Sequence, residues 1–294
     1  MNPSDADRPP VQRFEHDAMA CTFELLLCEP DARYAAQAAD EAFAELDRLE
    51  AELSRFVPTS DVARINRLQP GEAVAVCEAT LECLELADQV ARLTGGAFDV
   101  AYASDPPAAG EPLMVDRRGA RVAVTRAGVR LDLGGIGKGY ALDRLARLLR
   151  QWDITCALLH AGQSTALACG PGPGGEGWRL PLRDPRGADH TLGHVCLRDA
   201  ALSGSGRTLH GAHIVDPRAG TAAAGHLAAW ALAPSAALAD GLSTAAMVLD
   251  EAAIRQVCRQ ADGVAIGVLD ERSGRPRWID PRAAARFTPA GESA

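Results

Sequence analysis

The chain has 294 residues, of which 47% are hydrophobic and 23% are charged, and its formal net charge is −9. These values are ordinary for a globular protein, and the length is sufficient for one large domain or two small ones. The acidic balance argues against a nucleic-acid-binding protein, because such proteins neutralise phosphates with a basic surface. Only 4% of the residues are aromatic, so the core must consist mainly of alanine, leucine and valine.

The sequence also limits where the protein is expected to act. No stretch approaches 18 apolar residues without a charge, so no membrane span is predicted. Residues 1–14 lack the basic region and the apolar run of an export signal. The eight cysteines contain no C-x-x-C pair, and free thiols are favoured over disulfides when no export signal is found. We therefore expect a cytoplasmic location.

The first third of the chain is predicted to be mainly helical. Residues 1–12 are predicted to be a disordered tail, and a buried strand is expected at 19–29. Helices are expected at 31–56, 59–68 and 77–96, because these segments are rich in helix-forming residues. Thr59 or Ser60 is the expected cap of the second helix, and Gly95–Gly96 ends the third.

Strands, loops and helices follow one another irregularly in the rest of the chain. Loops are expected at 104–112 and 168–177. Strands are predicted at 121–126, 128–134, 154–162, 178–184, 194–204, about 227–233, 263–271 and 275–280, and helices at 140–152, 237–250 and 251–260. This order favours an α+β fold with mixed or antiparallel sheets and packed helices over a regular βαβ array.

The segment Gly134–Gly139 contains four glycines and Lys138, the only lysine of the chain. It lies between a predicted strand and a predicted helix, where backbone N–H groups and a helix N-terminus favour an anion. It is not a P-loop, which would need glycine at Asp132, and not a dinucleotide fingerprint, which would need glycine at Tyr140. A tight turn with positive φ is one interpretation. The lone lysine favours a phosphate site, because its ammonium is compact whereas a guanidinium is wide.

Two further segments carry candidate functional groups. Asp240 and Thr244 are four residues apart on a predicted helix, so they share one face. Both offer hard oxygen ligands suited to Mg²⁺, although Asp240 near a helix start and a buried Thr244 would also be ordinary structural features. His213 lies in the segment GAHIVDPRAG and is either a general base or a structural histidine in a turn.

Over residues 14–270 the chain resembles the FAD:protein FMN transferases, the ApbE family. The resemblance rests on seven segments in family order, none of which is specific alone. They are MACT (19–22), LSRFVPTSDVARINR (53–67), TGGAFDV (94–100), LDLGGIGKGYALDRLARLL (131–149), GWRLPLRDP (177–185), HIVDPRAG (213–220) and ADGLSTAAMVLD (239–250).

The resemblance implies both an activity and an architecture. The family transfers the FMN half of FAD to a threonine or serine hydroxyl of a target protein, with Mg²⁺ on the pyrophosphate and with release of AMP. It implies a single flavin transferase domain at 13–287, built of two intertwined lobes with the ligand cleft between them, followed by a tail at 288–294. The implied partners are FAD and an acceptor flavoprotein with its flavinylation motif.

Carried over by position, the resemblance also implies a set of site residues. Three would bind the metal: Gly135 through its backbone oxygen, Asp240 through its carboxylate and Thr244 through its hydroxyl. His213 is the implied base that deprotonates the acceptor hydroxyl. Contacts to FAD are implied for Met19, Phe56, Ala97, Phe98, Asp99, Asp132, Lys138 and Ile214.

The sequence departs from the family pattern at three short segments, one of which is a family TSG turn that reads LSG here at 202–204. A family GGD turn is replaced here by a glycine followed by Gln163 and Ser164, and a family MGT segment reads MACT. The altered turn at Gln163 and Ser164 motivates one alternative, an FAD-binding protein without transferase activity. A separate alternative is an FAD pyrophosphatase, in which water replaces the protein hydroxyl and FMN and AMP are the products.

Overall fold

The computed structural model describes residues 10–105, 111–187, 190–207, 214–223, 225–271, 274–279 and 287–290. The helices of this part are α1 (Ala32–Leu53), α2 (Asp61–Ile65), α3 (Glu78–Leu93), α4 (Gly137–Gln151), α5 (Ala236–Ala246) and α6 (Glu251–Gln260). The strands are β1 (Val11–Ala18), β2 (Cys21–Cys28), β3 (Ala73–Ala75), β4 (Leu113–Asp116), β5 (Arg121–Val124), β6 (Ala157–Ala161), β7 (Thr165–Cys169), β8 (Trp178–Arg183), β9 (Thr191–Leu197), β10 (Ala200–Gly206), β11 (Val215–Asp216), β12 (Thr221–Ala222), β13 (Ala228–Ala233), β14 (Ala265–Leu269), β15 (Arg277–Trp278) and β16 (Phe287–Pro289).

An eight-stranded sheet forms the centre of the molecule, in the order β1-β2-β6-β7-β10-β13-β14-β15. Two three-stranded sheets, β16-β9-β8 and β3-β5-β4, and the hairpin β11-β12 complete the described sheets. All of these pairings are antiparallel. The predicted α+β class is confirmed, and the sheets are antiparallel rather than mixed.

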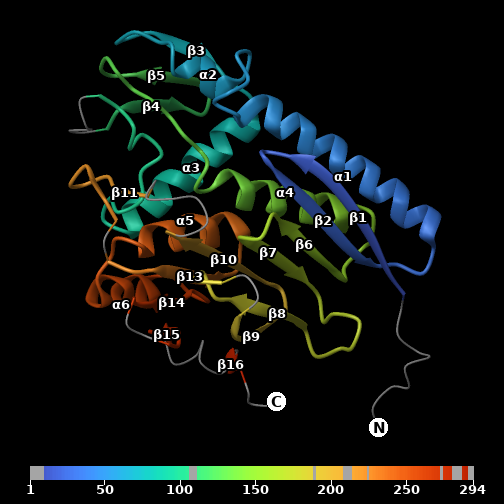
Figure 1. Cartoon of the computed structure of the whole chain (residues 1–294). Helices are drawn as coiled ribbons and strands as arrows, with labels where there is room; N and C mark the ends of the chain where they lie inside the picture. The colour runs from blue at the N-terminus through green and yellow to red at the C-terminus, as the bar shows by residue number, and fades with distance from the viewer. Residues whose placement is uncertain are drawn as a thin grey trace.

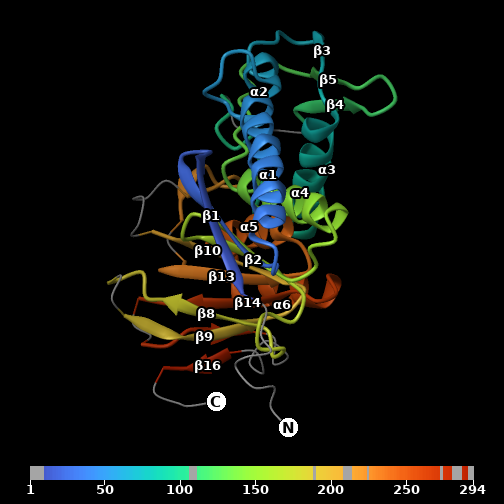
Figure 2. The ribbon, with the colours of Figure 1, turned by 90° about the vertical axis from the view of Figure 1, so that its right-hand side faces the viewer.

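Helices cover one face of the large sheet and the sheet β8-β9-β16 covers part of the other (Figures 1 and 2). Strand β13 shows this arrangement in its side chains, which point alternately to opposite faces. Ala229 and Ala231 belong to the helix-side core, whereas Trp230 and Leu232 belong to the core between the sheets. The small sheet β3-β5-β4 lies with α2 at the far end of α1 and α3 (Figure 1).

Helices α4 and α5 cross closely, and each binds the start of the other. A Cβ at Gly139 would lie 2.2 Å from the carbonyl oxygen of Ala236, so only glycine allows this approach. The carboxylate of Asp143 in α4 accepts hydrogen bonds from the backbone N–H groups of Ala236 and Ala237. In return, Asp240 Oδ2 in α5 accepts from the Gly139 N–H at 3.1 Å. These contacts fix Asp240 at the N-terminus of α4, where the helix dipole favours a negative charge.

The predicted helices of the first third are confirmed, with sharper ends. Ser60, and not Thr59, caps α2, because its Oγ accepts from the Ala63 N–H at 3.0 Å. Gly95 and Gly96 follow α3 with φ of +59° and +80°, as expected for residues that end a helix.

The strand predicted at 128–134 is wrong. This segment pairs with no strand, and Gly128 at its start takes a φ of +73°. The Asn66 side chain bonds to its middle residue instead. Asn66 Nδ2 donates to the Leu131 carbonyl at 3.0 Å, and Asn66 Oδ1 accepts from the Leu131 N–H at 2.6 Å. The Asp132 N–H donates to the Val100 carbonyl at 2.8 Å, so the approach to the glycine loop is held by other loops.

Two other strand predictions need correction. The single strand predicted at 194–204 is two strands, β9 and β10, because Asp199 takes a φ of +47° between them. Strand β1 was not predicted; its exposed positions are mostly polar, and only Phe14 and His16 mark the inner face clearly. Its full-length pairing with β2 places Val11–Ala18 at the edge of the large sheet, so residues 11 and 12 belong to a strand and not to the predicted tail.

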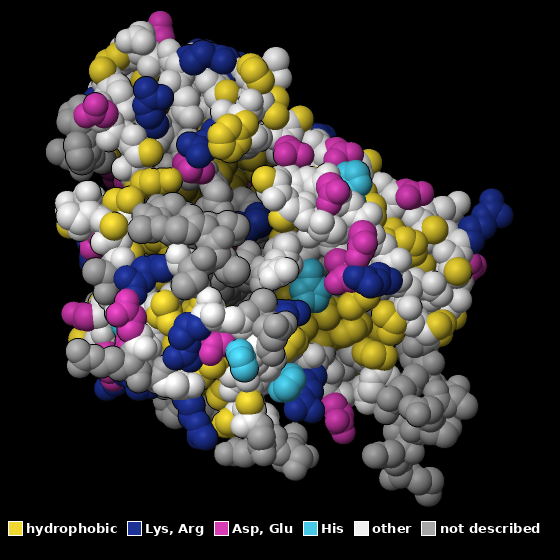
Figure 3. Space-filling view, in the orientation of Figure 1, with side chains coloured by type: hydrophobic (Ala, Val, Ile, Leu, Met, Phe, Trp, Pro, Cys, Tyr) yellow, Lys and Arg dark blue, Asp and Glu magenta, His cyan; other side chains and the backbone are white. Residues whose placement is uncertain are grey.

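All eight cysteines lie in the described part of the chain and are free thiols, as predicted. None of the helices described above combines the length and the apolarity that a membrane crossing requires. On the face shown in Figure 3, acidic and basic side chains are interspersed over the described surface.

Candidate functional site

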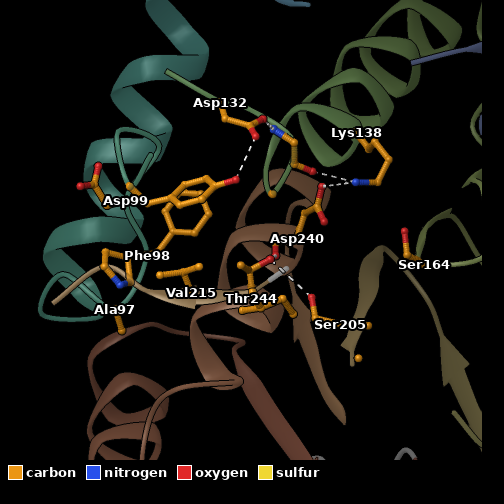
Figure 4. Close-up of a pocket in the computed structure, with 17 residues that line it drawn as sticks. Ala97, Phe98, Asp99, Asp132, Lys138, Ser164, Ser205, Val215, Asp240 and Thr244 are labelled. Carbon is orange, nitrogen blue, oxygen red and sulfur yellow. Dashed lines mark hydrogen bonds and ion pairs between the residues drawn. The ribbon is translucent and has the colours of Figure 1, made fainter. Parts of the chain in front are cut away.

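Two adjoining cavities lie around the start of α4. The larger, of about 300 Å³, is bounded by the 97–102 loop, the glycine loop, β10, the 214–217 segment and α5 (Figure 4). The smaller, of about 270 Å³, is bounded by the β1–β2 turn, the end of α1 and the same glycine loop. Asp132, Gly134 and Lys138 line both cavities. The segment singled out in the sequence is therefore the wall that the two cavities share.

The three residues implied as metal ligands come together in the larger cavity. Asp240 and Thr244 lie on one face of α5, as their spacing predicted, and the Thr244 hydroxyl donates to the Asp240 carbonyl at 3.2 Å. Gly135 lies against this face, because a Cβ placed on it would be 3.3 Å from Thr244 Oγ1. A carboxylate, a hydroxyl and a backbone carbonyl are thus available from three residues that line one cavity.

The Asp240 carboxylate is buried, with 4% of the residue exposed, and both of its oxygens have partners. Oδ1 accepts from the Ser203 hydroxyl at 3.3 Å, and Oδ2 accepts from the Gly139 N–H. Lys138 Nζ lies 3.8 Å from Oδ2 and donates to the Gly134 carbonyl at 2.9 Å (Figure 4). Lys138 thereby bridges the glycine loop and Asp240, which is the position expected for a group that neutralises a ligand between them.

The charges that line the cavities favour an additional cation. The two cavities are bordered by four carboxylates and by two basic side chains, the lysine of the shared wall and one arginine. The carboxylates are Glu50, Asp99, Asp132 and Asp240. An anionic ligand would add further negative charge, so Mg²⁺ fits the deficit, and its preferred hard oxygen ligands are present. No three His, Cys, Asp or Glu side chains of the described residues form a metal cluster, so an ion held here needs hydroxyl or carbonyl ligands such as Thr244 and Gly135.

The side chains of the larger cavity are mainly those named from the sequence. Ala97, Phe98 and Asp99 line it from the turn after α3, and Ile214 lines it from the opposite segment. Tyr102 also lines it but was not predicted. Its place two residues after the AFDV segment was the available signal, although its partner, Asp132, lies 30 residues further along the chain.

The smaller cavity has a more open, aromatic rim. Phe56 is 78% exposed there, and the guanidinium carbon of Arg55 lies 4.5 Å from the centre of its ring. Met19 and Ala20 form the two-residue β1–β2 turn with φ of +50° and +59°. The Met19 N–H donates to Glu50 Oε1 at 2.9 Å, which ties this unusual turn to α1. An exposed phenylalanine at a cavity rim offers a stacking surface for a flat ligand.

The comparisons with known proteins agree with this arrangement. The family model described as the ApbE family matches residues 19–105 and 108–267. The chain belongs to the ApbE family. It is 24% identical to the FAD:protein FMN transferase of Salmonella typhimurium over 93% of this chain and 89% of that protein. The crystal structure of the ApbE protein from Thermotoga maritima is 25% identical with a TM-score of 0.77, covering 88% of this chain and 94% of that one. The flavin transferase ApbE from Vibrio cholerae, at 20% identity, has a TM-score of 0.78 and shares the fold over 92% of this chain and 97% of that one.

The turn that contains Gln163 and Ser164, where this chain departs from the ApbE pattern, contributes to the larger cavity. Ser164 lines the larger cavity, and its hydroxyl lies 3.4 Å from Thr165 Oγ1. Thr165 Oγ1 is in turn 2.9 Å from Ser203 Oγ, which donates to Asp240. Ser205 Oγ lies 3.4 Å from Thr244 Oγ1. Ser243 Oγ connects the two parts, because it lies 3.4 Å from Ser203 Oγ and 2.9 Å from Ser205 Oγ. A chain of hydroxyl groups therefore extends from the altered turn to the two side chains implied as metal ligands, and it was not predicted.

One implied residue cannot be placed. His213 lies outside the described residues, so its role as the base stays a prediction. Downstream of it, Asp216 accepts two hydrogen bonds from the Arg218 guanidinium, at 2.9 and 2.8 Å. This hydrogen bonding lowers the pKa of Asp216 below its usual range.

Proposed function

We propose that this protein transfers the FMN half of FAD to a threonine or serine hydroxyl of an acceptor protein and releases AMP, with Mg²⁺ as cofactor. The observation that carries the proposal is the shared wall of the two cavities. FAD consists of two ring systems joined by a pyrophosphate, and here two cavities meet at Lys138 and the glycine loop. The printed activity of the relatives, FAD:protein FMN transferase, supports the same reaction.

The proposed reaction is a phosphoryl-group transfer. The acceptor hydroxyl oxygen bonds to the phosphorus of the FMN half, the bond from that phosphorus to the bridging oxygen breaks, and AMP leaves with this oxygen. The hydroxyl proton would go to His213, as the resemblance implies. Reactions of this kind depend mainly on positioning and charge neutralisation, with little covalent chemistry from the protein.

The chain's own groups are suited to this task. The Lys138 ammonium and the N-terminal turn of α4 face the junction where negative charge would increase. When bound, Mg²⁺ would draw charge from the pyrophosphate oxygens, and Gly135, Asp240 and Thr244 are the residues that would hold it. Phe56 in the smaller cavity would carry the flavin, and Phe98 and Ile214 would border the other half of FAD. A cytoplasmic location is part of the proposal, supported by the eight free thiols.

The proposal is tested by incubating the protein with FAD, Mg²⁺ and a purified acceptor that carries the family's threonine or serine target motif. The expected result is covalent flavin on the acceptor together with AMP. The same acceptor with the target hydroxyl residue replaced by alanine is the control. FAD binding without AMP release would favour a binding protein, and AMP release without any acceptor would favour an FAD pyrophosphatase; either result overturns the proposal.

A further inference from the structure

Three side chains from separate segments meet where the two cavities join. Asp132 lines both cavities, and its two carboxylate oxygens have different partners. Oδ1 accepts from the Gly134 N–H at 2.9 Å, which holds the start of the glycine loop. Oδ2 accepts from the Tyr102 hydroxyl at 3.1 Å and lies 3.5 Å from Arg55 Nε. One carboxylate thus connects the glycine loop to a residue after α1 and to a residue after α3.

The backbone around this contact is already fixed. The Asp132 N–H donates to the Val100 carbonyl, and the Asn66 side chain bonds both the N–H and the carbonyl of Leu131. The bonds from Tyr102 and Arg55 therefore add little to the path of the chain. They act on the carboxylate itself, whose Oδ1 holds the Gly134 N–H at the start of the glycine loop.

The bonds from Tyr102 and Arg55 offset negative charge where the two cavities join. Asp132 would face a pyrophosphate that is itself negative, and like charges repel. Arg55 is the second basic side chain lining the two cavities, after Lys138. Its charge and the Tyr102 hydroxyl compensate the same oxygen, Asp132 Oδ2. Burial and the Asp132 charge raise the pKa of the Tyr102 phenol above its ordinary value.

We infer that Tyr102 and Arg55 are positioning residues for FAD: together they hold and neutralise Asp132 so that the glycine loop can accept the pyrophosphate. This inference rests on the proposed function, because it takes FAD as the ligand. Both residues act through Asp132, so their effects should depend on its carboxylate.

The test measures the Kd of FAD by fluorescence titration for Tyr102→Phe and Arg55→Met, each in the unaltered chain and in an Asp132→Asn background. We expect each substitution alone to raise the Kd about fivefold and to change it less than about twofold beside Asp132→Asn, because interacting residues are non-additive. Where transfer is measured, the KM for FAD should rise and kcat should stay within about twofold. Tyr34→Phe and Arg92→Met are matched controls, because the Tyr34 hydroxyl and the Arg92 guanidinium make their hydrogen bond and ion pair with residues that do not line either cavity.

The outcomes separate this inference from the proposed function. Equal Kd values for all variants, or the same change with and without the Asp132 carboxylate, would overturn the positioning role while FAD binding itself stands. A rise in Kd that parallels a fall in melting temperature in both backgrounds would indicate a structural role and would overturn it too. Failure of the unaltered protein to bind FAD would overturn both.

Discussion

Replacing Lys138 by methionine and by arginine is the most informative change to the shared wall. The ammonium has three N–H donors, and one of them is used by the Gly134 carbonyl. Two donors remain for ligand oxygens, and hydrogen bonds to charged groups contribute about 1.5 kcal/mol each. Lys138→Met should therefore cost about 3 kcal/mol of FAD binding, or about 100-fold in Kd.

Lys138→Arg keeps the charge and changes its shape. A guanidinium is wide and planar, so we expect it to disturb the contacts that the compact ammonium makes with Gly134 and Asp240. We expect a loss of about tenfold in Kd, between the unaltered chain and Lys138→Met. Fluorescence titration with FAD measures the Kd of all three proteins. Arg147→Met, on the exposed side of the same helix, is the control. Equal affinity for Lys138→Arg and the unaltered chain would show that the lone lysine is incidental.

Three further substitutions test other parts of the account. Asp240→Ala should abolish Mg²⁺-dependent turnover while the circular dichroism spectrum stays native, and unchanged turnover across a Mg²⁺ titration would refute the metal assignment. Gly139→Ala should lower the melting temperature by several degrees, since the added Cβ would clash with the Ala236 carbonyl and overpacking costs about 1–3 kcal/mol. Gly274→Ala is the control and should leave the melting temperature unchanged, because a Cβ at that position meets no atom within 4 Å. Arg218→Met should destabilise the protein above pH 3.8, the ordinary pKa of Asp216. The difference in unfolding free energy between the two proteins should shrink as the pH falls through the lowered folded-state pKa of Asp216. Urea unfolding at several pH values measures this difference, and a difference that grows in acid would contradict the prediction.

The parts of the fold that follow from local signals were predictable from the sequence. Helices α1, α3 and α5 contain periodic apolar positions or strong helix formers, and their caps lie within a few residues. The shared face of Asp240 and Thr244 follows from the helical repeat alone. The strand predicted at 128–134 failed for the opposite reason, because its hydrogen-bond partners are loop groups rather than a strand, among them the side chain of Asn66, 65 residues away.

The same distinction applies to the site. The glycine-rich segment and its lysine could be singled out because they are unusual within a few residues. The need for glycine at position 139 could not be predicted, because it comes from the close approach of Ala236, in a helix almost 100 residues later. Tyr102 and Arg55 are ordinary residues in sequence, and only the fold brings them to Asp132. Long-range contacts of this kind have no local pattern from which to infer them.

The measurement that tests the central claim most directly is the stoichiometry of covalent flavin and AMP in one reaction. Intact-mass spectrometry counts FMN adducts on the acceptor, and chromatography of the same sample counts AMP. The account predicts one AMP for each FMN attached, no adduct on the acceptor without its target hydroxyl, and neither product with Asp240→Ala. AMP in excess over adduct, or bound FAD with no adduct, would contradict it.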